Sequence, residues 1–140
     1  MTGLSAADLV TKARAARGRA YAPYSGFQVG AALLTDTGEV VCAANVENAS
    51  YGLGMCAERS AVFAAVAAGH RRFEAIAVAG NGADPVTPCG ACRQVLREFP
   101  NGLGLWVLCA GETGDRLLDT TLEDLLPESF GPEALLGAAR

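Results

Sequence analysis

Two short cysteine-bearing segments, each at the predicted start of a helix, constrain this chain of 140 residues more than any other feature. The first reads C-A-E-R at 56–59 and opens an alanine-rich helix that we expect to end near residue 68, before Gly69. The second reads P-C-G-A-C at 88–92 and opens a helix that we expect to end near residue 98, before Pro100. The apolar run 74–79 between them predicts a buried strand, so the cysteines should meet at one end of a sheet.

The three cysteines of these segments suit a catalytic metal site. A helix N-terminus lowers the pKa of a thiol through its unpaired N–H groups, and the thiolate is the form that binds metal. Cys89 and Cys92 are one helical turn apart and therefore share a helix face. Together with Cys56 they offer three ligands to a tetrahedral zinc ion, which leaves the fourth position open for water.

Glu58 adds a group that can move protons at such a site. A carboxylate that is not itself a ligand can take a proton from the activated water and return it to a substrate. A metal-binding residue two positions before a glutamate, followed later by P-C-x-x-C, is the signature of zinc-dependent nucleobase deaminases. The chain has this signature as Cys56-x-Glu58 followed by Pro88-Cys89-x-x-Cys92.

Three further segments extend the resemblance beyond the metal ligands. They read Y-A-P-Y-S-G-F at 21–27, N-V-E-N-A-S-Y-G at 45–52 and F-G-P at 130–132. With these segments in the same order, the chain resembles the small, homotetrameric cytidine deaminases. The resemblance implies one Zn²⁺ per chain and the hydrolytic deamination of cytidine and 2′-deoxycytidine to uridine and 2′-deoxyuridine. Ammonia is released, and the implied role is pyrimidine salvage.

The same resemblance implies how individual residues treat the substrate base. It makes Glu58 the residue that takes the water proton, delivers it to N3 of the base and later protonates the leaving amino group. It makes the backbone N–H of Ala57 the donor to the ring carbonyl and places Phe27 against the pyrimidine. By pattern alone, Phe27 is simply the first residue of a core strand.

Other implied roles concern the sugar, the subunit partners and the charge of the site. Asn45 and Glu47 are expected to bind the ribose hydroxyls, with Glu47 accepting from the 3′-OH. Tyr51 and Phe130 are expected to reach the active sites of neighbouring subunits. Three thiolates on Zn²⁺ leave a net charge of about −1, and the guanidinium of Arg59 is expected to offset it.

Several alternatives compete with this interpretation. A C-x-x-C segment at the start of a helix is also typical of redox dithiols. A structural zinc site would need a fourth thiolate, and Cys42 and Cys109 lie in apolar runs where cysteine behaves as a small hydrophobic residue. A zinc-stabilised binding module without catalysis, and a deaminase of another aminopyrimidine such as a blasticidin-like nucleoside, also remain open.

Composition limits the partners and the compartment that we expect. The length predicts a single domain over residues 1–140, with about half of its residues apolar. A net charge of −4 and the lack of a basic run argue against a nucleic-acid polymer as partner. No apolar stretch is long enough to span a membrane. Five cysteines and an N-terminus unlike a signal peptide lead us to expect the cytoplasm.

The order of the predicted elements indicates a three-layer α/β/α sandwich around a mixed five-stranded sheet. The connection at 111–115 is too short for a parallel crossover, so the last two strands should pair antiparallel. The two cysteine-bearing helices should begin at the carboxyl ends of strands, where open α/β sheets bind ligands. The expected helices span 5–17, 56–68, 89–98 and 122–126, and the expected strands span 27–35, 40–44, 74–79, 103–109 and 116–119.

Overall fold

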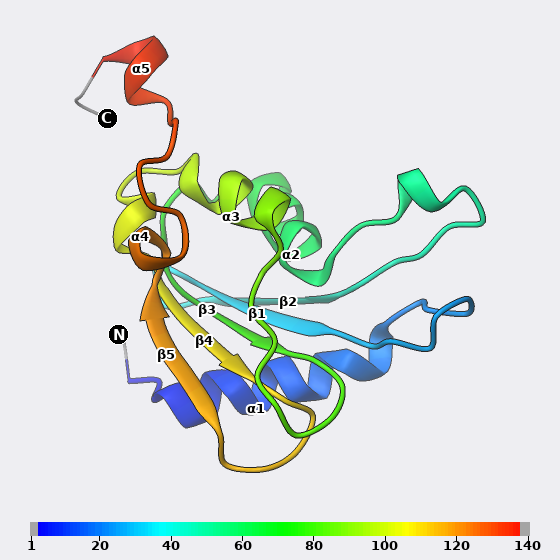
Figure 1. The fold of residues 1–140 in the computed structure, drawn as a ribbon. Coiled ribbons are helices and arrows are strands. Elements are labelled where there is room, and N and C mark those ends of the chain that lie inside the picture. The colour runs from blue at the N-terminus through cyan, green and yellow to red at the C-terminus, as the bar shows by residue number, and fades with distance from the viewer. Residues whose placement is uncertain (1–2, 138–140) are drawn as a thin grey trace.

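The computed structural model describes residues 3–137, and its centre is a mixed five-stranded sheet in the order β2-β1-β3-β4-β5 (Figure 1). The neighbours of β1 pair antiparallel with it on both sides, β3 and β4 pair parallel, and β4 and β5 pair antiparallel as predicted. The strands are β1 (Gly30–Thr35), β2 (Val40–Ala44), β3 (Phe73–Ala79), β4 (Trp106–Ala110) and β5 (Leu117–Thr121).

The helices cover both faces of this sheet, which confirms the predicted three layers. Figure 1 shows α1 on one face and both α2 and α3 on the other. The α-helices are α1 (Ala6–Ala16), α2 (Ala57–Ala67), α3 (Gly90–Arg97), α4 (Leu122–Leu125) and α5 (Glu133–Leu136). Short 3₁₀ turns span Arg17–Arg19, Tyr51–Leu53 and Gly102–Gly104.

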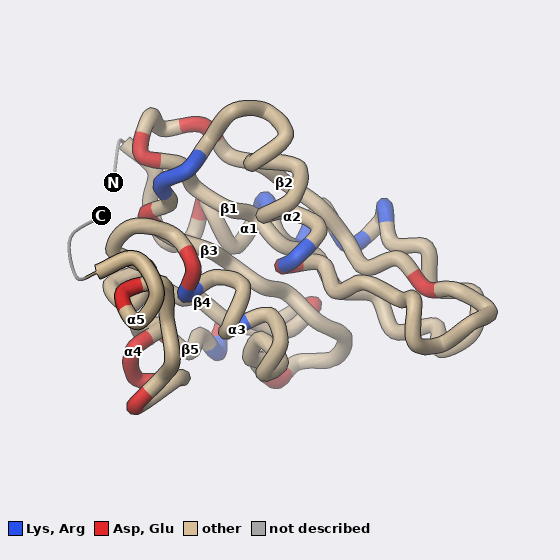
Figure 2. The backbone as a smooth tube through the Cα atoms, turned by 90° about the horizontal axis from the view of Figure 1, so that it is seen from above, with Lys and Arg blue, Asp and Glu red and all other residues tan. Residues whose placement is uncertain are grey.

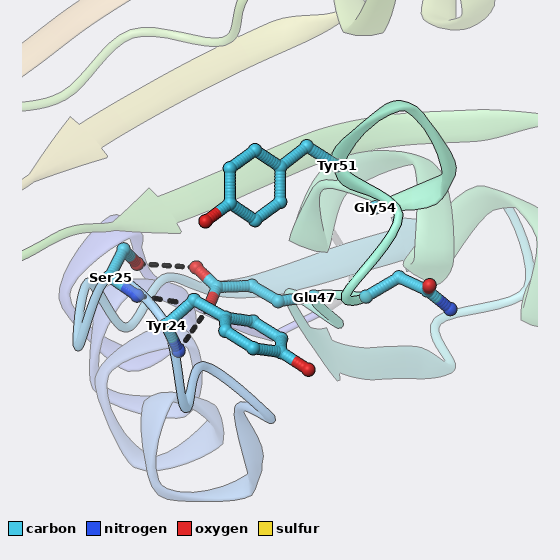
Figure 3. A pocket seen from close by; sticks show the side chains of 6 residues that line it. Tyr24, Ser25, Glu47, Tyr51 and Gly54 are labelled. Carbon is cyan, nitrogen blue, oxygen red and sulfur yellow. Dashed lines mark hydrogen bonds between the residues drawn. The ribbon is translucent and has the colours of Figure 1, made fainter.

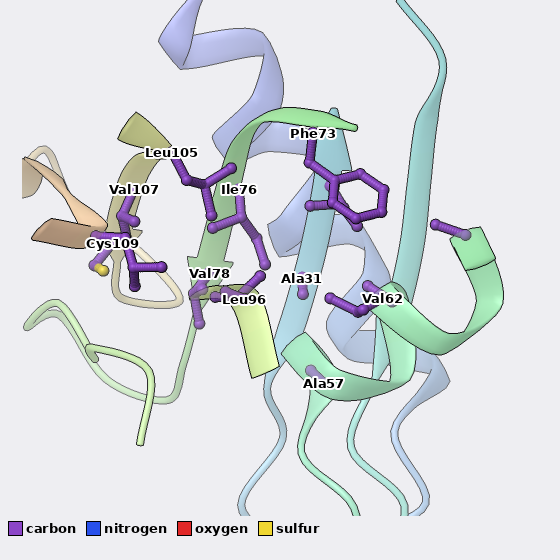
Figure 4. Close-up of a cluster of buried hydrophobic side chains, with 14 residues drawn as sticks. Ala31, Ala57, Val62, Phe73, Ile76, Val78, Leu96, Leu105, Val107 and Cys109 are labelled. Carbon is purple, nitrogen blue, oxygen red and sulfur yellow. The ribbon is translucent and has the colours of Figure 1, made fainter. Parts of the chain in front are cut away.

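Alternation along the central strands explains the two cores. Successive side chains of a strand point to opposite faces, so each central strand contributes to both layers. Leu33 and Val78 pack under α2 and α3, in the cluster that Figure 4 shows, whereas Leu34 and Ala77 pack against α1. Burial on both faces is the reason that the central strands read as continuous apolar runs in the sequence.

The residues at the helix starts explain where two of the cysteines lie. Ser5 and Asp8 form a reciprocal capping box at α1. Cys56 is the N-cap residue of α2 and Cys89 is the N-cap residue of α3. Because α2 follows β2 and α3 follows β3, and β2 and β3 run in the same direction, both helix N-termini lie at the same end of the sheet.

Two expected strands begin later than predicted, and one short helix was not expected. The strand expected over 27–35 begins at Gly30, and the strand expected over 103–109 begins at Trp106. Residues 102–104 form a 3₁₀ turn instead, after Asn101 adopts a left-handed conformation with φ 56°. The tail after Pro127 contains the short helix α5, which the sequence pattern did not predict.

We expected neither a nucleic-acid partner nor a membrane span, and the charge distribution and the lengths of the helices bear on these two expectations. Figure 2 shows Lys and Arg spread over several elements, while Asp and Glu are frequent around α4 and α5. The absence of a nucleic-acid partner stays a prediction. Among residues 3–137, no helix is both long enough and apolar enough to cross a membrane.

Candidate active site

The three predicted ligands come together at the N-termini of α2 and α3. Sγ of Cys89 lies 3.8 Å from Sγ of Cys56 and 3.4 Å from Sγ of Cys92. All three sulfur atoms lie within 4.8 Å of one another. Tetrahedral zinc with Zn–S bonds of about 2.3 Å requires sulfur atoms separated by about 3.8 Å. The donor set and its spacing therefore fit one zinc ion.

Charge within this cluster is distributed unequally among the thiols. The hydrogen bond with Cys92, helped by bonds from Arg59 and Cys89, lowers the pKa of Cys56 to about 5. The hydrogen bond with Cys56, together with burial, raises the pKa of Cys92. Cys56 is therefore the first of the two to become a thiolate. Metal binding would release the remaining protons of the three thiols, because zinc is coordinated by thiolates.

Glu58 lies in the first turn of α2 beside the sulfur atoms and is only 4 % exposed. Burial raises the pKa of this carboxyl group to about 7, and the negative charge of Cys56 contributes to the rise. A carboxyl group that titrates near neutral pH can both accept and release a proton during one reaction cycle. Glu58 is therefore suited to acid–base catalysis.

A cavity of about 320 Å³ joins this cluster to most of the other predicted residues. Val29, Met55 and Val86 supply apolar walls, which suits a planar ring held by a few polar groups. The predicted residues that line it are Phe27, Asn45, Glu47, Cys56, Ala57, Glu58 and Cys89.

Asn45 supports the segment that carries Phe27. Its Oδ1 accepts a hydrogen bond of 2.9 Å from the N–H of Val29, and its Nδ2 donates one of 2.8 Å to the carbonyl of Phe27. Phe27 is 41 % exposed and lines the cavity, so its predicted place in a core strand was wrong. The physical reason is that side-chain hydrogen bonds replace most of the strand ladder along residues 27–29.

Glu47 is held by the loop that precedes Phe27. Its Oε1 accepts hydrogen bonds from the N–H groups of Tyr24 (3.0 Å) and Ser25 (3.1 Å), and its Oε2 accepts one from the Ser25 hydroxyl (Figure 3). The hydroxyl bond from Ser25 is the main reason that the pKa of Glu47 is lowered from its ordinary value of 4.5. Three of the roughly four acceptor positions of the carboxylate are thus occupied.

Tyr51 lies in a second pocket, of about 360 Å³, that shares Glu47 and Gly54 with the first. Figure 3 shows the rings of Tyr51 and Tyr24 on opposite sides of Glu47. The ring centroids are 6.1 Å apart in an edge-to-face arrangement. Tyr51 is nevertheless 81 % exposed.

Phe130 does not join the other predicted residues in this chain. It lies on the segment between α4 and α5, against α3, and is 62 % exposed. Its backbone carbonyl accepts a hydrogen bond of 2.9 Å from Nε2 of Gln94. The structure of a single chain therefore brings together all the predicted site residues except Phe130, with Tyr51 at the edge.

Sequence reasoning missed several residues that shape the cavity. Val29, Val86 and Thr87 line it directly, and Ser25 orients Glu47. Val86 and Thr87 come just before Pro88, so their closeness to the C-x-x-C segment was the available signal. Ser25 lies in the segment 21–27 that carries the resemblance, but nothing in that segment indicated its contact with Glu47, because a bridge between Tyr21 and Val46 brings the two loops together.

Comparisons with known proteins agree with this geometry. The family model described as "Cytidine and deoxycytidylate deaminase zinc-binding region" matches residues 5–104. A cytidine deaminase of Sporosarcina psychrophila is 47% identical over 131 residues, which cover 94% of this chain and 95% of that protein. A blasticidin-S deaminase of Bacillus cereus is 33% identical over 110 residues, covering 73% of this chain and 76% of that protein.

A solved structure shows the same fold at high sequence identity. The crystal structure of cytidine deaminase from Burkholderia pseudomallei superposes with a TM-score of 0.86 and is 51% identical. The match covers 91% of this chain and 100% of that one. The chain therefore belongs to the cytidine and deoxycytidylate deaminase family.

Proposed function

We propose that this chain is a cytidine deaminase that converts cytidine and 2′-deoxycytidine to uridine and 2′-deoxyuridine. Water adds its oxygen to C4 of the base, the C4–N bond breaks, and ammonia leaves. The observation that carries this proposal is the buried carboxyl group of Glu58 beside three clustered sulfur atoms, in a cavity that also contains Asn45 and Glu47. The family membership and the similarity to cytidine deaminases support it.

Cys56, Cys89 and Cys92 would hold one Zn²⁺ per chain. When bound, the ion supplies Lewis-acid activation of water at neutral pH. Arg59 donates a hydrogen bond to Sγ of Cys56 and keeps a positive charge beside the anionic sulfur atoms. This arrangement offsets the excess negative charge of a site with three thiolates.

Glu58 carries the protons of the reaction. Its carboxylate takes a proton from the attacking water and delivers it to N3 of the base, which makes C4 more electrophilic. The same group then takes the second proton, from the hydroxyl group now on C4, and gives it to the amino nitrogen as it leaves. A pKa of about 7 fits both steps. Burial keeps bulk water from exchanging these protons during the cycle.

Different residues of the cavity bind the base and the sugar. Phe27 packs against the pyrimidine, and the N–H of Ala57, in the first turn of α2, donates to the ring carbonyl. Asn45 and Glu47 bind the ribose. Because Ser25 and Tyr24 already occupy three acceptor positions of Glu47, the carboxylate has room for about one sugar hydroxyl, the 3′-OH, which ribose and deoxyribose share.

The complete enzyme is proposed to be a cytoplasmic homotetramer of single-domain chains with shared active sites. Phe130 is exposed and lies away from the cavity of its own chain, although an aromatic ring gains most from being buried. Tyr51 is exposed at the rim of the adjacent pocket. Both residues are therefore available to complete the site of a neighbouring subunit. The implied role is pyrimidine salvage.

The decisive experiment follows the ultraviolet absorbance change when cytidine becomes uridine, with the wild type and Glu58→Gln compared at equal zinc content. The amide keeps the size of the side chain but cannot carry a proton, so we expect turnover to fall by at least about 10²- to 10⁴-fold with zinc retained. Cytidine and 2′-deoxycytidine should both be converted faster than blasticidin S. A zinc-loaded wild type without activity on either nucleoside would overturn the proposal.

A further inference from the structure

Two side chains from distant parts of the sequence form hydrogen bonds with the backbone of Gln28. Its N–H donates a hydrogen bond of 3.3 Å to Oδ1 of Asn81, and its carbonyl accepts one of 3.2 Å from Nε of Arg17. Arg17 also donates a bond of 2.6 Å from Nη2 to the same Oδ1 of Asn81. Arg17 and Asn81, which we call the Gln28 clamp, thus satisfy both backbone groups of one residue.

Gln28 lies in sequence between two residues that line the cavity. Phe27 and Val29 both line it, and residues 27–29 precede the first residue of β1, Gly30. Asn45 bonds the carbonyl of Phe27 and the N–H of Val29. The Gln28 clamp supplies the bonds between these two positions. With the bond of 3.0 Å from the N–H of Phe27 to Oγ of Ser25, five side-chain hydrogen bonds along three residues fix the backbone that carries the ring of Phe27.

Arg17 is built into the fold as an internal connector. Its side chain is 12% exposed, and Nη1 forms an ion pair of 3.0 Å with Oε2 of Glu112 in the turn between β4 and β5. The helix end that carries it lies directly against the start of β1, since a Cβ on Gly30 would lie 2.0 Å from the Ala13 carbonyl oxygen. A guanidinium with its donors fixed on several acceptors in this way holds its partners in one geometry.

We infer that Arg17 and Asn81 are positioning residues that set the substrate affinity of the proposed deaminase through Phe27. This inference rests on the proposed function. Both lie outside the set of described residues that line the cavity, so they act on the base only through the segment they hold. Loosening this segment lets the ring of Phe27 move away from the pyrimidine, which weakens substrate binding and leaves Glu58 and the cysteines in place.

The test compares Arg17→Ala and Asn81→Ala with wild type in zinc content, kcat and KM for cytidine. We expect KM to rise about three- to tenfold, the range expected from losing one or two hydrogen bonds, with kcat within about twofold and zinc unchanged. Asn81→Asp keeps an acceptor for both donors and should restore KM to near the wild-type value. Unchanged KM in both alanine variants of an active enzyme would overturn the inference.

Matched control variants separate positioning from general stability. Arg14 lies one turn before Arg17 and donates hydrogen bonds to the carbonyls of Gly111 and Gly114. Arg14→Ala therefore removes a similar number of hydrogen bonds and leaves those of Gln28 intact. Glu112→Gln removes only the ion pair. Both controls should lower thermal stability and leave KM near the wild-type value. A rise of KM in the controls equal to that in Arg17→Ala would reduce the Gln28 clamp to a stabilising role.

A double-mutant cycle with Phe27→Ala identifies the route of the effect. If the Gln28 clamp acts through the ring, Asn81→Ala should raise KM in the wild-type background and have little further effect once Phe27 is alanine. Additive effects on KM would show that Asn81 acts by another route. Asn81 is in a loop, so its variants keep the test available if Arg17→Ala does not fold.

Amide hydrogen exchange provides a readout that does not depend on activity. The N–H of Gln28 should exchange faster in Asn81→Ala than in wild type, and Arg14→Ala should not change its rate. An inactive wild type with this exchange pattern would refute the proposed function while keeping the structural role of the Gln28 clamp. An active wild type with unchanged exchange and KM would refute the inference alone.

Discussion

Nη2 of Arg59 donates a hydrogen bond of 3.4 Å to Sγ of Cys56, one turn back along α2. The bond raises the pKa of Arg59 above its already high ordinary value, so the guanidinium stays charged. Three thiolates around Zn²⁺ carry one negative charge more than the ion neutralises. The positive charge of Arg59, held beside one of these sulfur atoms, therefore stabilises the zinc-loaded site and favours the activation of water within it.

Replacing Arg59 by glutamine should weaken this site without dismantling it. We expect Arg59→Gln to fold, and to lose about 10- to 100-fold in zinc affinity or in kcat, as when other groups that hydrogen-bond a metal ligand are removed. Zinc release to a chelator and steady-state kinetics measure the two effects. Arg71→Gln is the matched control, because Arg71 bonds backbone carbonyls near the opposite end of α2. Wild-type values for both quantities in Arg59→Gln would contradict the role.

The five cysteines should divide cleanly into ligands and core residues. Alanine at 56, 89 or 92 should abolish stoichiometric zinc and lower stability, because metal binding is coupled to folding. Cys42→Ala and Cys109→Ala should retain zinc. Cys109 is buried in β4, and burial raises its pKa to about 12, so it stays a thiol. Metal analysis of the purified variants decides the matter, and full zinc retention in Cys89→Ala would disprove the ligand assignment.

The metal site was predictable because its signals are local. A cysteine before a helical pattern predicts a ligand at a helix N-terminus. The pairing of the last two strands, β4 and β5, had a local signal too, because the connection at 111–115 is too short for a parallel crossover. The structure agrees, with Cys56 and Cys89 as N-cap residues. The first four residues of the hairpin strand β2 are only half buried, yet the pattern located this strand too.

The parts that escaped prediction depend on contacts between distant segments. The run 27–35 reads as one apolar strand, and nothing in it shows that Asn45, Asn81 and Arg17 bond the backbone of its first three residues. The orientation of Glu47 by Ser25 likewise depends on two loops meeting. Periodicity reports burial along an element, and it does not report which polar side chain replaces a ladder partner.

Ser25 should control how Glu47 responds to pH. The pKa of Glu47 is lowered in the fold, mainly by the Ser25 hydroxyl, so the carboxylate persists to lower pH than an ordinary glutamate does. The stabilisation from these bonds is present above the ordinary pKa and is lost as the pH falls through the lowered value. In Ser25→Ala the pKa should move back up, and its KM should increase more steeply than that of wild type as the pH falls toward 4.5.

The measurement is the ratio of KM in Ser25→Ala to KM in wild type across mildly acidic and neutral pH. Taking the ratio at each pH cancels changes common to both proteins, such as protonation of the cysteines. We expect a constant ratio above about pH 6 and a rising ratio below it. Ser25→Thr keeps a hydroxyl and serves as the control. A ratio independent of pH would show that the hydroxyl bond does not tune Glu47.

The segment that carries Phe130 is fixed to α3 while its ring faces outward. Arg97 is only 8 % exposed, and it bonds Ser129 (2.8 Å) on one side of Phe130 and Glu133 (2.8 Å) on the other. Gly131 lies so close that a Cβ there would be 2.4 Å from Cζ of Arg97. An anchored backbone with a 62 % exposed aromatic ring presents that ring to a partner at little entropic cost.

Phe130→Ala should therefore raise KM for cytidine and leave zinc content unchanged. Aromatic packing contributes roughly 0.5–1.5 kcal/mol beyond area burial, which corresponds to about a two- to tenfold change in KM. Leu135→Ala removes another exposed apolar side chain, from the neighbouring helix α5, and should leave KM near wild type. If Phe130 instead folds onto its own chain, its removal would lower thermal stability and spare KM. Light scattering at assay concentration completes the test, because a fully active monomer would rule out a site shared between subunits.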